Sequence, residues 1–170
     1  MLRGAAAFLV ALSASGAGYL YSMRLALRVK KLEKILLFIS QIKTEIEFTA
    51  DSVSGIFASV SSGNDLSLLP FVALCLEKMS GGEDFSTAWN GALDEKESVR
   101  ALKNEDVALL RSFGSSLGAT DCGGQMRNCE MHSRLFRERL NCAVEDKKRL
   151  YKPTRAGGLL TGAALLIILL

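Results

Sequence analysis

The sequence has few of the residues that catalytic sites and β-sheets use. Its 170 residues include one histidine, His132, and two prolines. A nucleophile–histidine–acid site would have to use His132, and nothing in the sequence places a nucleophile and an acid around it. Few prolines and no alternating apolar–polar segment of useful length argue against an all-β fold. We therefore expect a helical protein that is not an enzyme.

The chain also lacks motifs for nucleotides and metals. Its glycine pairs, at 81–82, 123–124 and 157–158, have neither a P-loop lysine nor a G-x-G-x-x-G context. There is no C-x-x-C, and the spacing of Cys122, Cys129 and His132 matches no metal site with a known mechanism. We expect no cofactor, no metal and no small-molecule substrate.

Neither sign of charge dominates, and a net charge of +3 argues against a nucleic-acid binder. The charge is unevenly placed. Residues 22–31 hold 4 basic residues and no acid, residues 32–126 hold 7 basic and 14 acidic residues, and residues 127–156 hold 9 basic and 4 acidic residues. The basic ends suit anionic lipid, so we expect membrane lipid as a partner.

The first uncharged segment, Gly4 to Tyr21, predicts a transmembrane helix. At ~1.5 Å per residue it nearly matches a hydrocarbon core of ~30 Å. Its many small residues would let another helix approach closely. The alternative is a cleaved signal peptide, with Arg3 before the apolar run and Ser13-Ala14-Ser15 as the cleavage site. We favour an uncleaved anchor, because basic residues follow the segment directly and hold that flank in the cytoplasm.

The second uncharged segment, residues 156–170, predicts a short transmembrane helix of ~22 Å. A buried core helix is the alternative, but such a helix is not usually preceded by five basic residues. Basic flanks at both inner edges predict that the middle domain is cytoplasmic and both termini lie outside. These flanking residues are Arg24, Arg28, Lys30, Lys31, Lys147, Lys148, Arg149, Lys152 and Arg155.

Apolar spacing between the two segments predicts an all-α bundle of about six helices. The first continues from the N-terminal segment to about Thr49, and the others cover about 52–60, 67–79, 84–93, 103–117 and 120–150. We expect Ser67 to cap the third helix and Gly118 to end the fifth. Pro153 should separate the last helix from the tail with a kink.

The sequence therefore predicts three parts: a transmembrane anchor at 1–22, a cytoplasmic helical bundle at 23–155 and a transmembrane segment at 156–170. In the cytoplasm the four cysteines should be free thiols. If the domain were instead exported, they could form two disulfides in any of three pairings.

Several strings resemble those of a known family. They are Phe38 to Ile46, the Gly82 to Trp89 element that ends in Ala-Trp, Leu117-Gly118-Ala119-Thr120-Asp121 with Gln125, and Tyr151-Lys152 before the terminal apolar run. Together they are similar to stage III sporulation protein AB over the whole chain. Thr120 stands where the family has serine, which keeps a capping hydroxyl, and Pro153 departs from the pattern.

This resemblance implies a role in endospore-forming bacteria, in a secretion-like complex that links mother cell and forespore. It implies a platform-like domain, similar to the inner-membrane platform of type II secretion and type IV pilus machines. The implied partners are the cytoplasmic ATPase of the same operon, stage III sporulation protein AA, and other stage III sporulation membrane proteins. The family has no known catalytic residues. The family-motif residues with an expected structural role are Trp89, Leu117, Gly118, Thr120, Asp121 and Gln125.

We therefore expect a non-enzymatic membrane platform of the mother-cell membrane. Acidic residues in two turns, Glu83-Asp84 and Asp94-Glu95, are the candidate face for the ATPase. The alternatives are the platform of another secretion or pilus machine, a membrane-bound enzyme and an exported disulfide-bonded domain.

Overall fold

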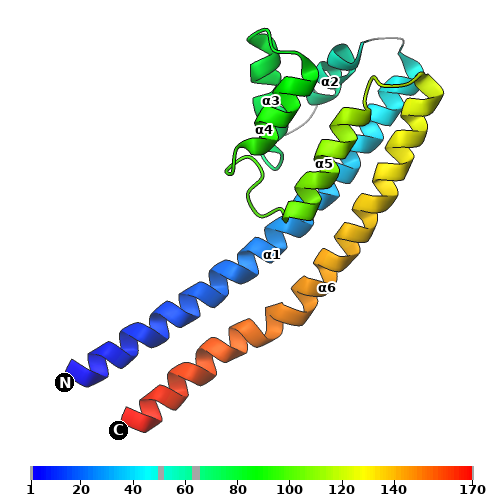
Figure 1. Cartoon of the computed structure of the whole chain (residues 1–170). Coiled ribbons are helices and arrows are strands. Elements are labelled where there is room, and N and C mark those ends of the chain that lie inside the picture. Colours follow the sequence, from blue (N-terminus) through cyan, green and yellow to red (C-terminus); the bar gives the residue numbers. More distant parts are fainter. Residues whose placement is uncertain (1, 50–51, 63–65, 170) are drawn as a thin grey trace. The chain divides into compact units, whose positions relative to one another are not determined.

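The computed structural model describes residues 2–49, 52–62 and 66–169, with side chains described from residue 20 to residue 149 within these ranges. Six α-helices and no strand occur in these ranges, which confirms the all-α prediction (Figure 1). The helices are α1 (Leu2–Phe48), α2 (Val53–Ser62), α3 (Pro70–Ser80), α4 (Phe85–Asp94), α5 (Asn104–Ser116) and α6 (Cys122–Leu169).

The chain forms two compact units. One contains residues 30–141, with α2 to α5 and the adjoining parts of α1 and α6. The other contains residues 1–29 and 142–170, which are the remaining parts of the same two long helices. We refer to the first unit as the bundle.

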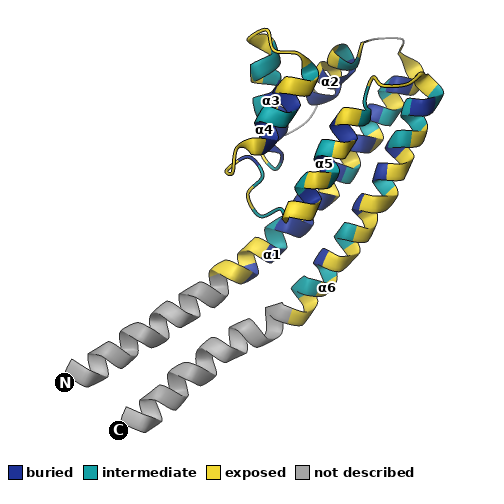
Figure 2. Cartoon of the chain, viewed as in Figure 1, coloured by how far each residue is buried: buried dark blue, intermediate teal, exposed yellow. Residues whose placement is uncertain are grey.

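In the bundle, α1 presents an apolar stripe at helical spacing. Leu32, Ile35, Ile39 and Ile42 are almost completely buried, while Ser40 is exposed. Figure 2 shows buried and exposed positions alternating along this helix. Residues three and four apart share one face of an α-helix, so this sequence pattern sets which face turns inward. The short helices complete the bundle, because α2 packs on α3, α3 on α4 and α4 on α5.

Side-chain caps explain where three of the helices begin. The Ser52 hydroxyl accepts the Gly55 N–H at 3.2 Å, Asp84 Oδ2 accepts the Thr87 N–H at 3.0 Å, and Asp121 Oδ1 accepts the Gly124 N–H at 3.0 Å. Each cap satisfies a backbone donor that has no partner within its own helix.

The start of α3 differs from the sequence prediction, which placed Ser67 at the cap. The helix begins at Pro70, and Leu69 is the cap residue with no side-chain hydrogen bond. A turn closed by the Leu69 N–H on the Leu66 carbonyl precedes it. Leu69 is fully buried, and proline is well tolerated at the first helical position because its missing N–H has no partner there. The helix therefore starts at Pro70, three residues after the predicted cap.

Pro153 was also expected to separate the last helix from the tail, whereas α6 continues through it to Leu169. A proline within a helix removes one backbone hydrogen bond, and the flanking turns can continue the helix. The predicted membrane segments at 4–21 and 156–170 lie almost entirely outside the residues whose side chains are described. Within the searched, described part of the chain, no helix is both long and apolar enough to cross a membrane.

Trp89 lies at the centre of the bundle core. Its ring centroid is 5.7 Å from that of Phe57, 5.6 Å from that of Phe71 and 6.4 Å from that of Phe113. Its indole N–H donates to the Leu110 carbonyl at 2.9 Å. Edge-to-face aromatic packing and a satisfied indole are the usual conditions for burying tryptophan. This residue therefore joins α2, α3, α4 and α5.

Candidate functional site

The family-motif residues other than Trp89 gather where α5 ends and α6 begins. Gly118 has a φ of +77°, a left-handed conformation that glycine adopts without strain, and it follows Leu117 at the end of α5. Asp121 then caps α6, and the Gln125 amide donates to the Thr120 carbonyl at 3.1 Å. The motif thus encodes a helix stop, a tight turn and a helix start.

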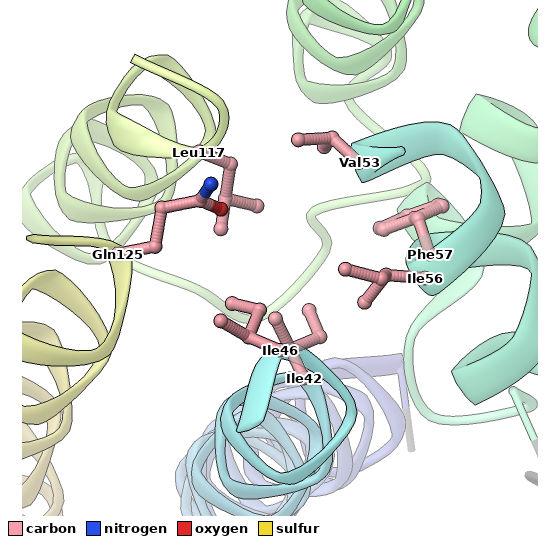
Figure 3. A pocket seen from close by; sticks show the side chains of 7 residues that line it. All are labelled: Ile42, Ile46, Val53, Ile56, Phe57, Leu117 and Gln125. Atoms are coloured by element: carbon pink, nitrogen blue, oxygen red, sulfur yellow. The ribbon is translucent and has the colours of Figure 1, made fainter. Parts of the chain in front are cut away.

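A small apolar pocket lies beside this turn (Figure 3). Its lining comes from three helices and the end of α5: Ile42, Ile46, Val53, Ile56, Phe57, Leu117 and Gln125. The space available in it is about 10 Å³, which is near the lower limit for one water molecule. The pocket therefore has no room for an organic ligand, and its lining brings side chains of α1, α2 and α6 together beside the turn.

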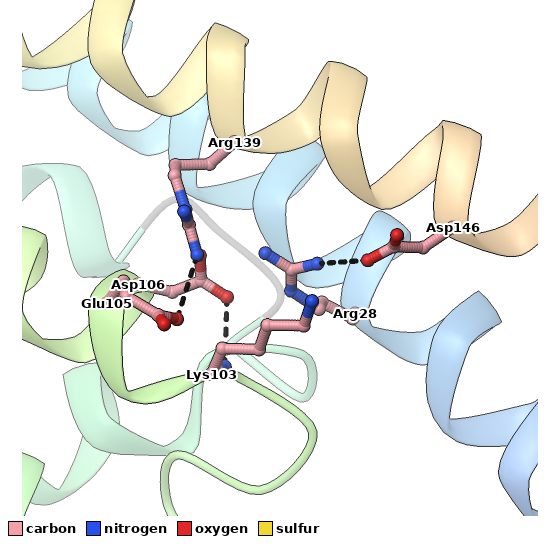
Figure 4. Close-up of polar contacts among 6 residues, drawn as sticks. All are labelled: Arg28, Lys103, Glu105, Asp106, Arg139 and Asp146. Carbon is pink, nitrogen blue, oxygen red and sulfur yellow. Dashed lines mark hydrogen bonds and ion pairs between the residues drawn. The ribbon is translucent and has the colours of Figure 1, made fainter.

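A buried carboxylate connects α5 to α6 (Figure 4). Asp106 is fully buried, and its two oxygens accept from Arg139 Nε at 2.8 Å and from the Lys103 N–H at 2.9 Å. Arg139 Nη2 also contacts Glu105 Oε2 at 3.0 Å. Hydrogen bonding to Asp106 is the main reason that the pKa of Arg139 is raised. Glu105 and Asp106 are both in the first turn of α5, but only the tertiary structure reveals that Asp106 is buried.

Of the seven predicted membrane-flanking basic residues whose side chains the structure describes, two lie inside the protein. Arg28 is 2% exposed and pairs with Asp146 at 3.5 Å, within the unit formed by the two chain ends. Lys31, 4% exposed, donates to the Ser98 carbonyl at 3.3 Å in the bundle, and burial is the main cause of its lowered pKa. Both follow the inward stripe of α1 rather than its exposed side.

The other flanking residues differ in their exposure. Arg24, Lys30, Lys148 and Arg149 are exposed and Lys147 is half-buried. Lys152 and Arg155 lie outside the residues whose side chains are described. The exposed members keep the charge that an anionic lipid surface would attract.

The four acidic residues of the candidate partner face lie in two pairs at the two ends of α4. Glu83 and Asp84 precede α4, whereas Asp94 and Glu95 end it, and a helix of 10 residues separates the pairs by ~15 Å. Asp94 contacts Arg111 Nη2 at 2.6 Å, and Glu83 contacts Lys78 Nζ at 3.7 Å. Much of this charge is therefore already compensated within the chain.

His132 is 1% exposed and has structural partners. Its Nδ1 lies 2.9 Å from the Asn128 carbonyl, its Nε2 lies 3.3 Å from Ser112 Oγ, and its ring packs edge-on against Phe113. No acid completes a triad with these groups in the described side chains. The buried imidazole is therefore held in place by contacts with α5 and with its own helix, whereas Ser112 itself is exposed.

The four cysteines are free thiols, with Cys75 and Cys129 buried and Cys122 and Cys142 exposed. Among the side chains that the structure describes, no cluster of three or more histidine, cysteine or acidic residues could hold a metal ion. The thiols therefore act in packing or lie singly on the surface.

Comparisons with known proteins agree with this description. A solved structure of stage III sporulation protein AB (SpoIIIAB) superposes with a TM-score of 0.62 at 14% identity, covering 72% of this chain and 98% of that one. At this identity the likeness establishes the fold. No curated protein matches the sequence. The family model for stage III sporulation protein AB matches residues 3–170. The chain therefore belongs to the stage III sporulation protein AB family, and its role lies in sporulation.

Proposed function

We propose that the protein is a non-enzymatic platform that is anchored in the mother-cell membrane and docks a cytoplasmic ATPase within a secretion-like complex. The observation that carries the proposal is the continuity of α1 and α6. Each is one helix that joins the bundle to an uncharged sequence segment, Gly4 to Tyr21 at one end and residues 156–170 at the other. Such a connection would couple movement of the bundle to the two anchors.

The charge pattern supports a cytoplasmic bundle with both termini outside. Basic residues follow the first uncharged segment and precede the second, as expected for flanks that stay in the cytoplasm. Exposed members of this set, such as Arg24 and Lys30, remain available for anionic lipid. The single buried histidine and the lack of a ligand-sized pocket at the family motif favour a structural role over catalysis.

The proposed partners are the ATPase of the same operon, stage III sporulation protein AA, and other stage III sporulation membrane proteins. The two acidic ends of α4 would have to act as separate contacts with the ATPase. Glu95 is exposed at one end, and Asp84 is exposed at the other. The ATPase proposal thus depends on two points on one helix rather than on a continuous patch.

Co-purification tests this proposal. The full chain, expressed with the ATPase, is extracted from membranes in mild detergent, and the retained ATPase is quantified. We expect retention with the wild-type chain and reduced retention when Asp84 and Glu95 are both replaced by lysine. Replacing both Glu33 and Glu47 by lysine is the control, because these two residues are exposed on α1 and the change in net charge is the same. Retention by no variant, wild type included, would reject ATPase docking.

Membrane extraction tests the proposed anchor independently of ATPase binding. An integral protein stays in the membrane pellet after alkaline carbonate treatment, whereas a domain released by signal peptidase appears in the supernatant with residues 1–15 removed. Recovery in the supernatant would reject the anchored platform and support the exported domain.

A further inference from the structure

A polar cleft lies between α1 and α6 on the surface of the bundle. It has a volume of about 270 Å³. Its lining residues from α1 are Leu36, Ser40 and Lys43, and those from α6 are Glu130, Ser133, Arg134 and Arg137. All seven belong to one unit of the structure, so the cleft is a feature of the bundle itself. The family-motif residues and the acidic turns are not part of this lining.

One pair of charges in the cleft is neutralised within the chain. Lys43 Nζ lies 2.7 Å from Glu130 Oε1 and donates a hydrogen bond to it. This hydrogen bond is the main cause of a lowered pKa for Glu130 and a raised pKa for Lys43. The only acid that lines the cleft is therefore already engaged.

The two arginines of the cleft have no such partner. Within the described side chains, no carboxylate lies within ion-pair distance of Arg134 or Arg137, and both are exposed. Two other arginines of the bundle do pair with acids, Arg111 with Asp94 and Arg139 with Asp106. Both guanidiniums of the cleft are therefore exposed and without a direct ion pair, although the charge of Arg134 also helps to lower the pKa of Glu130.

We infer that this cleft is a docking site for a carboxylate-bearing segment of a partner protein. Arg134 and Arg137 are one helical turn apart, so their side chains share a face at a separation that suits two acids one turn apart on a partner helix. Guanidinium groups bind carboxylates through paired hydrogen bonds, which gives such a contact a defined geometry.

The rest of the lining fits a protein segment. Leu36 offers apolar surface for an aliphatic side chain, and Ser40 and Ser133 offer hydroxyls for backbone or side-chain hydrogen bonds. The inference requires only that the protein acts in a multiprotein sporulation assembly. It holds whether or not the partner is the ATPase, so its test is independent of the co-purification above.

Carbodiimide coupling tests the contact directly. The reagent joins an amine to a carboxylate with loss of water, so it acts only where the two groups touch. We would replace Arg137 with lysine in the full chain, which keeps the positive charge and places an amine in the cleft. Membranes from sporulating cells are treated, and the coupled peptides are identified by mass spectrometry. Arg134→Lys provides a second position, and Arg127→Lys is the matched control, because Arg127 is exposed on α6 outside the cleft.

The native Lys43–Glu130 pair provides an internal standard, since its coupling shows that the reagent has reached the cleft. With that standard present, we expect residue 137 or 134 to couple to an aspartate or glutamate of another protein, and residue 127 not to do so. Coupling only to Glu130, Glu138 or other acids of the same chain would overturn the inference. Mixing isotopically light and heavy chains distinguishes coupling within one chain from coupling between two copies of it. Coupling between two copies would indicate self-association instead of binding to a different protein.

Charge reversal supplies an independent readout. The double variant Arg134→Glu, Arg137→Glu should lower the count of heat-resistant spores, and Arg127→Glu should leave it unchanged. Helical circular dichroism of the purified chains verifies that each variant is folded. A normal spore count for the double variant would overturn the inference. A lowered count without any coupled protein would also overturn it, and would indicate a phosphate or an anionic lipid as the occupant.

Discussion

Trp89 packs directly against Gly114 in the bundle core. Gly114 lies in α5, and a Cβ placed on it would overlap the indole of Trp89, while the same indole donates to the Leu110 carbonyl. The indole cannot move away without losing that hydrogen bond or its contacts with Phe57 and Phe71. Gly114 is thus required by close approach, not by an unusual backbone conformation.

Gly114→Ala should lower the free energy of unfolding by about 1–3 kcal/mol, the usual effect of overpacking a core. Gly91→Ala is the matched control. Gly91 lies within α4, and its added Cβ would meet only the flexible end of Lys78 at 3.4 Å. That control should be neutral or stabilising by about 0.5–1 kcal/mol, because alanine favours a helix interior. Denaturant unfolding of the full chain in detergent, monitored by circular dichroism, measures the free energy of unfolding of both variants. If the two variants were equally stable, the close packing of Trp89 on Gly114 would not be what requires glycine at this position.

Arg139→Leu should lower the free energy of unfolding by about 1.5–3 kcal/mol, the range for hydrogen bonds to charged groups. The substitution removes the hydrogen bond that Arg139 donates to the fully buried Asp106. The hydrogen bond from the Lys103 N–H to Asp106 remains. A double-mutant cycle with Asp106→Asn measures the coupling, and the double variant should lose less than the sum of the two single variants. Arg127→Leu on the exposed face of α6 should change stability little. Additive losses in the cycle would show that the two side chains act separately.

At the scale of the helices, the sequence predicts most of what the structure contains. The apolar spacing of α1 depends on neighbours in the sequence, and the helix predicted from it agrees with the observed one. The caps Asp84 and Asp121 are likewise local, because each accepts from a backbone N–H three residues further on. The start of α3 differs from the prediction: the helix begins at Pro70, and Leu69 before it is buried by tertiary contacts. Local rules favoured Ser67 for that position.

The charged residues show more clearly that tertiary contacts cannot be predicted from the local sequence. Arg28 and Lys31 looked like solvated flanking residues, and their burial depends on partners 118 and 67 positions away in the sequence, Asp146 and Ser98. The cleft of Arg134 and Arg137 likewise requires α1 to lie beside α6. A sequence reveals the charge of such a residue, but only the fold shows whether a partner compensates it.

The cap of α6 gives a test at this scale. Asp121→Ala removes the acceptor for the Gly124 N–H and should lower the free energy of unfolding by about 1 kcal/mol. Asp121→Ser should restore most of this loss, because serine is an equivalent cap. Equilibrium unfolding of the full chain compares the three proteins. A serine variant as unstable as the alanine variant would mean that the carboxylate acts beyond capping.

The cap of α4 predicts a dependence on pH. Hydrogen bonds from the Thr87 hydroxyl, at 2.6 Å, and from its N–H lower the pKa of Asp84 below its ordinary value of 3.8. A lowered folded-state pKa stabilises the protein above the unfolded value, and this contribution is lost as the pH falls through the folded value. The stability advantage of wild type over Asp84→Ala should therefore be constant near neutral pH and shrink below pH 3.8. An advantage that does not change with pH would show that ionisation of Asp84 is irrelevant.

For the whole molecule, the four thiols divide into two classes that report its orientation. Burial raises the pKa of Cys75 to about 12 and that of Cys129 to about 11, so neither presents a reactive thiolate at neutral pH. Cys122 and Cys142 are exposed. Only the exposed pair should react while the protein is folded, whichever side of the membrane holds the bundle.

This division sharpens a labelling test of the proposed topology. In intact cells an impermeant maleimide should modify no thiol, since the bundle is proposed to be cytoplasmic. After the membrane is permeabilised, Cys122 and Cys142 should react, and after denaturation all four should react, as counted by mass on the full-length chain. Cys122→Ser and Cys142→Ser verify the assignment by each removing one modification from the second count. Modification of Cys122 or Cys142 in intact cells would place the bundle outside, where no cytoplasmic ATPase could reach it. The platform proposal would then fail, whereas the fold and the thiol classes would stand.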